Sequence, residues 1–220
     1  MGAKRLKMAN RWPRARGAMP DATGAVARAE FLPDADGWVP AARRVPSPNF
    51  DARPDGVPLD VVVIHNISLP PGQFGTGDIE AFFQNRLDAS RHPFFETIRD
   101  VRVSAHFLIA RDGALVQFVA CTQRAWHAGQ SDFCGRERCN DFSIGIEIEG
   151  SDDQPFTLAQ YDTAAALVAG LRAAYPIHGI AGHSDIAPGR KTDPGPHFDW
   201  DRFATLAGAP AGLFPYRRQL

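Results

Sequence analysis

The stretch Phe142-Ser-Ile-Gly-Ile-Glu-Ile-Glu149 predicts a β-strand, because its residues alternate strictly between the two faces of an extended chain. The two faces consist of Ile144, Ile146 and Ile148 and of Gly145, Glu147 and Glu149. A β-branched set this dense favours a central strand covered on both faces. Two carboxylates on one face of a buried strand are unfavourable unless they are paired or used, although a solvated edge strand would also tolerate them. Glu147 and Glu149 are therefore candidate functional residues, and Gly145 leaves room beside Glu147.

A second apolar run, Leu59-Asp-Val-Val-Val-Ile64, predicts another strand buried on both faces. It ends at His65 and Asn66, directly before a loop over residues 67–77 that is rich in Pro and Gly. Open sheets present functional side chains at strand ends, so His65 is a candidate ligand. The alternative is a hydrogen-bonded histidine of the core.

The rest of the chain predicts a mixed sheet with helices on its faces. Apolar spacing predicts helices over residues 78–87 and 157–175, the second opened by a capping box of Thr157 and Gln160. Strands are expected over 101–110, 115–120 and 177–182, the first two joined by the turn Arg111-Asp-Gly113, and Asp199 would cap a last short helix.

The predicted fold class is α/β, a single domain with a mixed central β-sheet flanked by helices and with long active-site loops. We expect the domain over residues 31–208, a disordered extension over 1–30 and a C-terminal tail over 209–220. The first 30 residues hold seven basic residues and no apolar segment after them, so we do not expect a secretory signal there. Met19 is an alternative start of the chain.

A loop rich in titratable side chains follows the last predicted strand: His183-Ser-Asp-Ile-Ala-Pro-Gly-Arg-Lys-Thr-Asp-Pro-Gly-Pro-His197. Neutral imidazole and carboxylate are the ligands of catalytic zinc, which keeps one position open for water. His65, His183 and Asp193 would supply such a set. A carboxylate on the strand over 142–149 could then take a proton from water, and Lys191 could stabilise an oxyanion.

Two further histidines and a tryptophan are candidates for the wall of a cleft. His106 falls inside the strand predicted over 101–110, where it is either a hydrogen-bonded core residue or part of a cleft wall. Trp126 and His127 share a loop with Gly129, and an aromatic face there suits a ligand wall. The alternative is that Trp126 anchors the loop by packing.

Composition excludes several classes of protein. The net charge of −1 provides no field that would recruit nucleic acid or an anionic membrane, and no apolar run approaches the roughly 20 residues of a membrane span. The three cysteines, Cys121, Cys134 and Cys139, do not suit a disulfide framework, which favours reduced thiols and a reducing compartment.

The chain also resembles a known family, the AmpD-type 1,6-anhydro-N-acetylmuramyl-L-alanine amidases of bacterial cell-wall recycling. The resemblance covers roughly residues 37–203 in order. It rests on the stretches Ala41-Ala-Arg-Arg-Val-Pro-Ser-Pro48, His65-Asn-Ile-Ser-Leu-Pro-Pro-Gly72, Val103-Ser-Ala-His106, Arg124-Ala-Trp-His-Ala-Gly129, Gly135-Arg-Glu-Arg-Cys-Asn-Asp-Phe-Ser-Ile-Gly-Ile-Glu147, Asp185-Ile-Ala-Pro188 and Lys191-Thr-Asp-Pro-Gly-Pro196.

This resemblance implies a cytoplasmic, zinc-dependent hydrolase that cuts the amide bond between (anhydro)muramic acid and L-alanine of muropeptides. It implies one Zn²⁺ per chain, held by His65, His183 and Asp193, with Glu147 rather than Glu149 as the base and Lys191 at the tetrahedral intermediate. We expect a monomer that binds small anhydromuramyl peptides and neither nucleic acid nor membrane. The substrate contacts that we expect are Asn66, Arg102, Trp126, His127 and Arg138, the last toward a peptide carboxylate.

Three rival functions remain at this stage. A binding module of the same superfamily would have lost a zinc ligand, whereas all three are present here. An amidase acting on intact cell wall would carry a legible signal peptide. A Cys–His hydrolase would combine Cys121 or Cys139 with His127.

Overall fold

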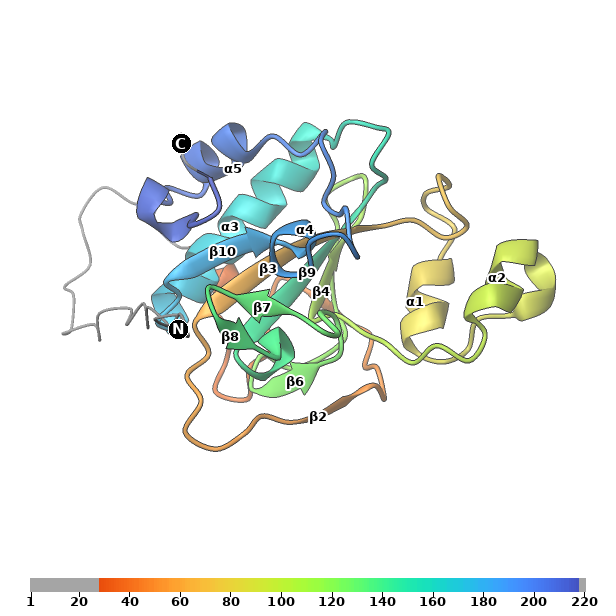
Figure 1. Cartoon of the computed structure of the whole chain (residues 1–220), viewed down its shortest axis with the longest axis horizontal. Coiled ribbons are helices and arrows are strands. Elements are labelled where there is room, and N and C mark those ends of the chain that lie inside the picture. Colours follow the sequence, from red (N-terminus) through yellow and green to blue (C-terminus); the bar gives the residue numbers. More distant parts are fainter. Residues whose placement is uncertain (1–27, 218–220) are drawn as a thin grey trace, which may run out of the picture.

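The computed structural model describes residues 28–217 and has a six-stranded mixed sheet at its centre, in the order β1-β5-β4-β9-β3-β10 (Figure 1). β3 pairs in parallel with both β9 and β10, and β9 pairs in parallel with β4. β5 runs antiparallel to β4 and parallel to β1. The predicted mixed sheet is therefore confirmed. Its strands are β1 (Arg43–Arg44), β3 (Val61–Ile67), β4 (Phe107–Ile109), β5 (Leu115–Gln117), β9 (Ser143–Glu149) and β10 (Gly179–Gly182).

In the described part of the chain, two small two-stranded ribbons, five α-helices and four 3-10 turns surround this sheet. The ribbons are β2 (Phe50–Ala52) with β6 (Gln123–Ala125), and β7 (Asp132–Phe133) with β8 (Arg136–Glu137). The α-helices are α1 (Asp78–Phe83), α2 (Pro93–Ile98), α3 (Leu158–Ala174), α4 (His183–Ile186) and α5 (Trp200–Leu206). The 3-10 turns are η1 (Ala29–Phe31), η2 (Ala89–Arg91), η3 (Cys139–Asp141) and η4 (Ala211–Leu213).

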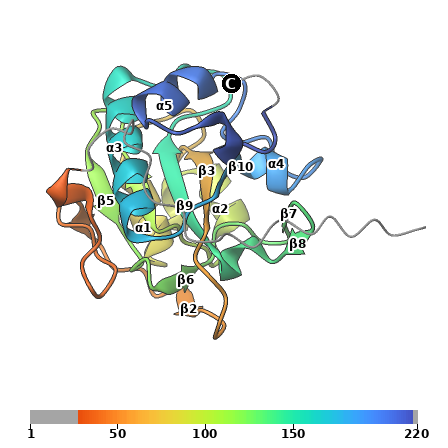
Figure 2. The same cartoon turned by 90° about the vertical axis from the view of Figure 1, so that its left-hand side faces the viewer.

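One face of the sheet carries the main core. α3 and α5 lie over it, and the three isoleucines of β9 pack there with Val62 and Ile64 of β3 (Figure 1 and Figure 2). The expected capping box opens α3, since the Thr157 hydroxyl accepts from the Gln160 N–H and the Gln160 side chain accepts from the Thr157 N–H. The alternation in residues 142–149 thus predicted correctly that the three isoleucines share one face of the strand, which is the face buried in the main core.

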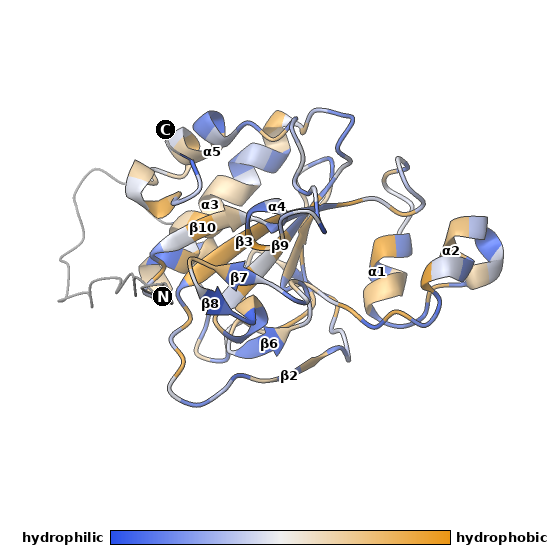
Figure 3. Cartoon of the chain, in the orientation of Figure 1, coloured by the Kyte–Doolittle hydropathy of each residue, from blue (hydrophilic) through white to orange (hydrophobic). Residues whose placement is uncertain are grey.

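The opposite face carries two smaller apolar clusters with polar residues between them. α1 and α2 cover the β4–β5 end, and the β7–β8 ribbon, η3 and α4 cover the β3–β10 end. Figure 3 shows apolar residues concentrated in the central strands and in α1. His65 of β3 and Glu147 of β9 are register partners on this face, between the two clusters. The site is therefore built on the face that α3 does not cover.

Several element boundaries differ from the prediction. β3 continues to Ile67, so His65 lies inside the strand rather than at its end. β4 begins only at Phe107, because the Ser104 N–H is bonded to the Trp126 carbonyl instead of a sheet neighbour. α1 ends at Phe83, shortly before the left-handed Asn85. Residues 183–186, expected as loop, form the single turn α4, whose Asp185 carboxylate accepts from the Gly182 N–H.

Of the predicted C-terminal tail over residues 209–220, the described part, residues 209–217, packs against the domain. Leu213 and Phe214 are buried in the core under α3 and α5, and the Arg217 guanidinium pairs with Asp185 of α4. Phe31 is likewise buried against α3, whereas most of the predicted extension, residues 1–27, and residues 218–220 lie outside the described residues. Within residues 28–217, no helix has the length and apolarity needed to cross a membrane.

Candidate active site

Sheet register brings the two predicted histidine ligands together. In the parallel pair of β3 and β10, Gly182 lies opposite Ile64, so His183, the first residue after β10, arrives beside His65. The chain then returns through the loop after α4, where the Ser184 N–H donates to the Asp193 carbonyl at 2.8 Å. His183 and Asp193, which follow His65 by 118 and 128 positions in the sequence, are thereby placed against it.

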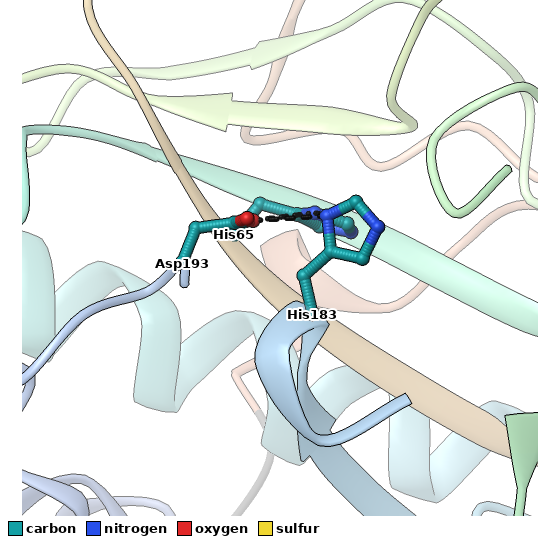
Figure 4. A group of neighbouring side chains, drawn as sticks. All are labelled: His65, His183 and Asp193. Carbon is teal, nitrogen blue, oxygen red and sulfur yellow. Dashed lines mark hydrogen bonds and ion pairs between the residues drawn. The ribbon is translucent and has the colours of Figure 1, made fainter. Parts of the chain in front are cut away.

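Three potential ligand atoms form a small triangle (Figure 4). Nδ1 of His65 lies 3.0 Å from Nδ1 of His183, and each nitrogen lies 3.1 Å from Oδ2 of Asp193. Both histidines are almost completely buried, and the Asp193 side chain is 14% exposed. Among the described residues, this set alone gathers three metal-ligand side chains closely enough to hold one ion.

The tautomer of His183 follows from its second ring nitrogen. Nε2 lies 3.1 Å from the carbonyl oxygen of Ala128, which can only accept a hydrogen bond. Nε2 therefore carries the proton in the neutral ring. Nδ1 then faces Asp193 and His65 with an unprotonated lone pair.

A longer chain of hydrogen bonds fixes the tautomer of His65. Ser143 donates its hydroxyl proton to the Cys139 carbonyl at 2.6 Å, so its oxygen accepts from Nε2 of His127 at 3.2 Å. The unprotonated Nδ1 of His127 then accepts from Nε2 of His65 at 2.9 Å. This leaves Nδ1 of His65 unprotonated as well.

Two imidazole lone pairs and one carboxylate oxygen thus converge with no proton available between them. Burial, followed by the charge of His183, lowers the pKa of His65 to about 4, which keeps that ring neutral at physiological pH. A neutral ring is the form that binds metal, and the repulsion among three lone pairs is relieved by a cation. The residues present therefore fit a metal ion, with His65, His183 and Asp193 as its protein ligands.

The two carboxylates of β9 differ in their surroundings. Glu149 is satisfied: Oε1 accepts from the Gly75 N–H at 2.7 Å, and Oε2 accepts from the Arg111 N–H at 3.1 Å. Glu147 is 9% exposed, and its Oε2 has no hydrogen-bond partner within residues 28–217. Burial and then the charge of Asp193 raise the pKa of Glu147 well above its ordinary value, while Lys191 opposes the shift. Glu149 holds loops in place, and Glu147 is free to act on a ligand.

Lys191 and the predicted substrate contacts lie around this centre in different settings. Lys191 is exposed, and its positive charge acts on both His65 and Glu147. The Asn66 amide donates to Asp152 at 2.7 Å and to the Pro194 carbonyl at 3.0 Å, so it steadies the loop that carries Asp193.

Three other predicted contacts have neighbours of their own. The exposed Arg102 guanidinium donates to the carbonyls of Arg99 and Val101. The Trp126 indole N–H is buried without a partner within residues 28–217. Arg138, left-handed at φ 63°, pairs with Asp141.

His127 has contacts that differ from those expected of a substrate-binding residue. It is 8% exposed, and both ring nitrogens are hydrogen-bonded inside the protein, to His65 and Ser143. Those bonds also leave no nitrogen free to activate a cysteine. Burial raises the pKa of the Cys121 thiol to about 12 and that of Cys139 to about 11, so neither thiol supplies a thiolate near neutral pH.

A pocket of about 430 Å³ lies between the β7–β8 ribbon and the end of α4. Arg190, which lines it, donates to the Ala128 carbonyl at 2.8 Å, the same oxygen that binds His183. Arg138 also lines this pocket. The pocket is therefore linked to the centre through Arg190 and the Ala128 carbonyl, and none of His65, Glu147, His183, Lys191 and Asp193 lines it.

Comparison with known proteins identifies the family. The family model described as N-acetylmuramoyl-L-alanine amidase matches residues 55–196. The 1,6-anhydro-N-acetylmuramyl-L-alanine amidase AmpD of Salmonella typhimurium (strain SL1344) is 56% identical over 178 residues, which are 80% of this chain and 95% of that protein. The chain thus belongs to the N-acetylmuramoyl-L-alanine amidase family.

Within that family the similarity is to the AmpD type. A crystal structure of a selenomethionine AmpD derivative superposes with a TM-score of 0.78 at 55% identity, covering 80% of this chain and 98% of the other. The amidase AmiD of Escherichia coli, solved with the substrate anhydro-N-acetylmuramic acid-L-Ala-D-γ-Glu-L-Lys, gives a TM-score of 0.51 at 30% identity over 69% of this chain and 59% of that one. These matches confirm the family resemblance and the fold class.

Proposed function

We propose that this chain is a zinc-dependent amidase that hydrolyses the bond between 1,6-anhydro-N-acetylmuramic acid and L-alanine in muropeptides, as part of peptidoglycan recycling. The observation that carries the proposal is the triangle of lone pairs on His65, His183 and Asp193. Two imidazoles and one carboxylate form a catalytic zinc set that leaves a position open, and we assign one Zn²⁺ per chain. The names of the relatives support the substrate class.

When bound, Zn²⁺ would polarise the scissile carbonyl and acidify water at the open position. Glu147 takes the proton of the attacking water, because it is the buried carboxylate on the same sheet face as His65 and has no structural partner among the described residues. It later delivers that proton to the leaving amine of L-alanine. Lys191 places its charge beside the oxyanion of the tetrahedral intermediate.

The substrate contacts follow from the surroundings of the centre. The unpartnered indole N–H of Trp126 can donate to a carbonyl of the substrate. Arg138 lines the pocket between the β7–β8 ribbon and α4, and it binds a peptide carboxylate there through paired N–H groups. Asn66 and Arg102 complete the proposed contacts, and the chain is proposed to act as a cytoplasmic monomer on soluble fragments.

Metal content and turnover test this proposal together. The wild-type protein should bind one equivalent of zinc, lose activity on chelation and regain it with Zn²⁺ but not with Mg²⁺, which prefers oxygen ligands. His183→Ala should lose both zinc and activity, because two ligands remain. Full zinc occupancy in His183→Ala would contradict the ligand assignment.

The substrate assignment needs its own comparison. An anhydromuramyl tripeptide should be hydrolysed faster than intact sacculi under the same conditions, since a soluble fragment is what a cytoplasmic enzyme meets. A protein that holds zinc and binds the fragment without cleaving it would be a binding module instead.

A further inference from the structure

His127 and Ser143 form a hydrogen-bonded relay between the core of the protein and the ligand His65. The relay runs from the Cys139 carbonyl through the Ser143 hydroxyl and the His127 ring to Nε2 of His65, over distances of 2.6, 3.2 and 2.9 Å. All the side chains in it are buried, with Ser143 at 0% and His127 at 8% exposure.

The two ligand histidines are fixed by different means. His183 rests directly on the Ala128 carbonyl, which accepts and cannot donate, so its tautomer has one solution. The partner of His65 is another imidazole, which can present either a proton or a lone pair. Without a further group, His127 could carry its proton on Nδ1, and the proton of His65 would then move to the nitrogen that faces the metal.

We propose that His127 is a positioning residue for the metal centre, and that Ser143 sets its direction so that His65 keeps the lone pair of Nδ1 for the metal. Ser143 can act in this way because its own proton is committed to the Cys139 carbonyl, which leaves only its oxygen for Nε2 of His127. The inference rests on the proposed zinc site and adds to it two residues that the ligand pattern does not contain.

Gly145 makes the space that the His127 ring occupies. A Cβ atom on Gly145 would lie 2.4 Å from Cγ and 2.6 Å from Nδ1 of His127, closer than atoms can approach. The glycine in an otherwise β-branched strand is thus explained by the close approach of an imidazole to the sheet.

The His127 ring is also held rigidly from its backbone. The side-chain oxygen of Asn140 accepts from the N–H groups of His127 and Ala128, at 3.1 and 2.8 Å. On the other side, the His106 ring lies edge-on to the His127 ring, with 5.7 Å between the ring centroids. Nδ1 of His106 accepts from the Gly145 N–H at 3.0 Å. The same short segment therefore orients both ligand histidines, His65 through a side chain and His183 through the Ala128 carbonyl.

Nitrogen-15 NMR of the imidazole rings in the metal-free full-length protein tests the relay directly. In the wild type, Nε2 of His65 should be protonated and Nδ1 should not. Ser143→Ala should give a mixture of the two tautomers at His65, because His127 loses the group that sets its direction. Ser104→Ala is the matched control, since Ser104 is a buried serine that holds the same loop at Trp126 but lies outside the relay.

Zinc affinity by chelator competition is the second readout. Ser143→Ala and His127→Phe should weaken zinc binding by about 10–100-fold, the usual effect of losing an outer partner of a ligand histidine. His127→Gln should recover much of this loss, because its amide oxygen can accept from Nε2 of His65. Ser104→Ala should bind zinc as the wild type does.

The outcomes separate this inference from the proposed function. Wild-type protein that fails to bind zinc would refute the metal centre, whatever the tautomers are. Wild-type protein that binds zinc, with unchanged affinity and an unchanged His65 tautomer in Ser143→Ala, would overturn the relay alone. If His127→Phe does not fold, Ser143→Ala and His127→Gln still decide the question.

Discussion

Exchanging the two glutamates of β9 for glutamine, one at a time, should separate catalysis from stability. Glu147→Gln keeps the size of the side chain and removes no hydrogen bond made by the described residues. It also replaces a buried carboxyl, whose pKa burial and Asp193 raise, by a group that cannot ionise. We therefore expect an unchanged or slightly higher melting temperature, retained zinc and a loss of about 10²–10⁴-fold in kcat.

Glu149→Gln should behave in the opposite way. Its two oxygens accept from the N–H groups of Gly75 and Arg111, and an amide offers only one acceptor oxygen. One N–H group would face an NH₂ group and lose its partner, which costs about 1–3 kcal/mol. For a domain of this length the melting temperature should fall by roughly 2–4 °C per kcal/mol, with kcat changed much less than in Glu147→Gln.

The assay is paired: thermal unfolding of the zinc-loaded proteins, and steady-state hydrolysis of an anhydromuramyl peptide with kcat and KM resolved. Loss of zinc from Glu147→Gln would make Glu147 a ligand rather than a base. Equal losses of kcat in the two variants would mean that the carboxylates share one proton and titrate as a pair. A fully active Glu147→Gln enzyme would remove this residue from the mechanism.

Two other perturbations follow from the same structure. The fold keeps His65 neutral by lowering its pKa from 6.5 to about 4, so the unfolded chain binds more protons than the folded chain in that range. Metal-free protein should therefore keep its full stability above about pH 6.5, and its free energy of unfolding should fall by about 3 kcal/mol from this group as the pH is lowered to about 4. Urea unfolding measures this change, and a flat pH profile would contradict a neutral His65. Arg217→Ala should remove the paired contacts of 2.9 and 2.8 Å to Asp185 of α4. We expect the free energy of unfolding to fall by about 1–2 kcal/mol and zinc binding through His183 to weaken. An unchanged melting temperature and zinc affinity would show that this C-terminal contact does not support the site.

The elements that the sequence predicted well are those whose signal is local. Alternation over residues 142–149 places three isoleucines on the α3 side, and the capping box of Thr157 and Gln160 is formed. The predicted end of the helix after Asp78 was wrong, because Leu87 continues the apolar spacing although the backbone already turns at Asn85. The apolar residue Leu206 is 40% exposed at the end of α5. Spacing alone does not show where a helix stops.

The site was only partly accessible from sequence, because its contacts are long-range. Residue types and the family resemblance pointed to His65, His183 and Asp193, but only the pairing of β3 with β10 puts the histidines side by side. Nothing in the sequence near His127 distinguishes a residue that touches substrate from one that supports a ligand. The difference depends on Ser143, which lies 16 residues away on a strand of the sheet.

Gly145 was the one local signal that could have exposed this arrangement. A glycine among β-branched residues weakens a strand, so its presence indicates that another group approaches the backbone there. On the same face of β9, the chain places Ser143 under Nε2 of His127, Gly145 under its ring and Glu147 next to His65. In the proposed arrangement, one strand sets the proton of His65, makes room for the His127 ring and supplies the carboxylate that acts as the base. Substitutions at Ser143 and Gly145 should consequently act on zinc binding and substitutions at Glu147 on kcat, while the isoleucines of the opposite face pack in the core beneath α3.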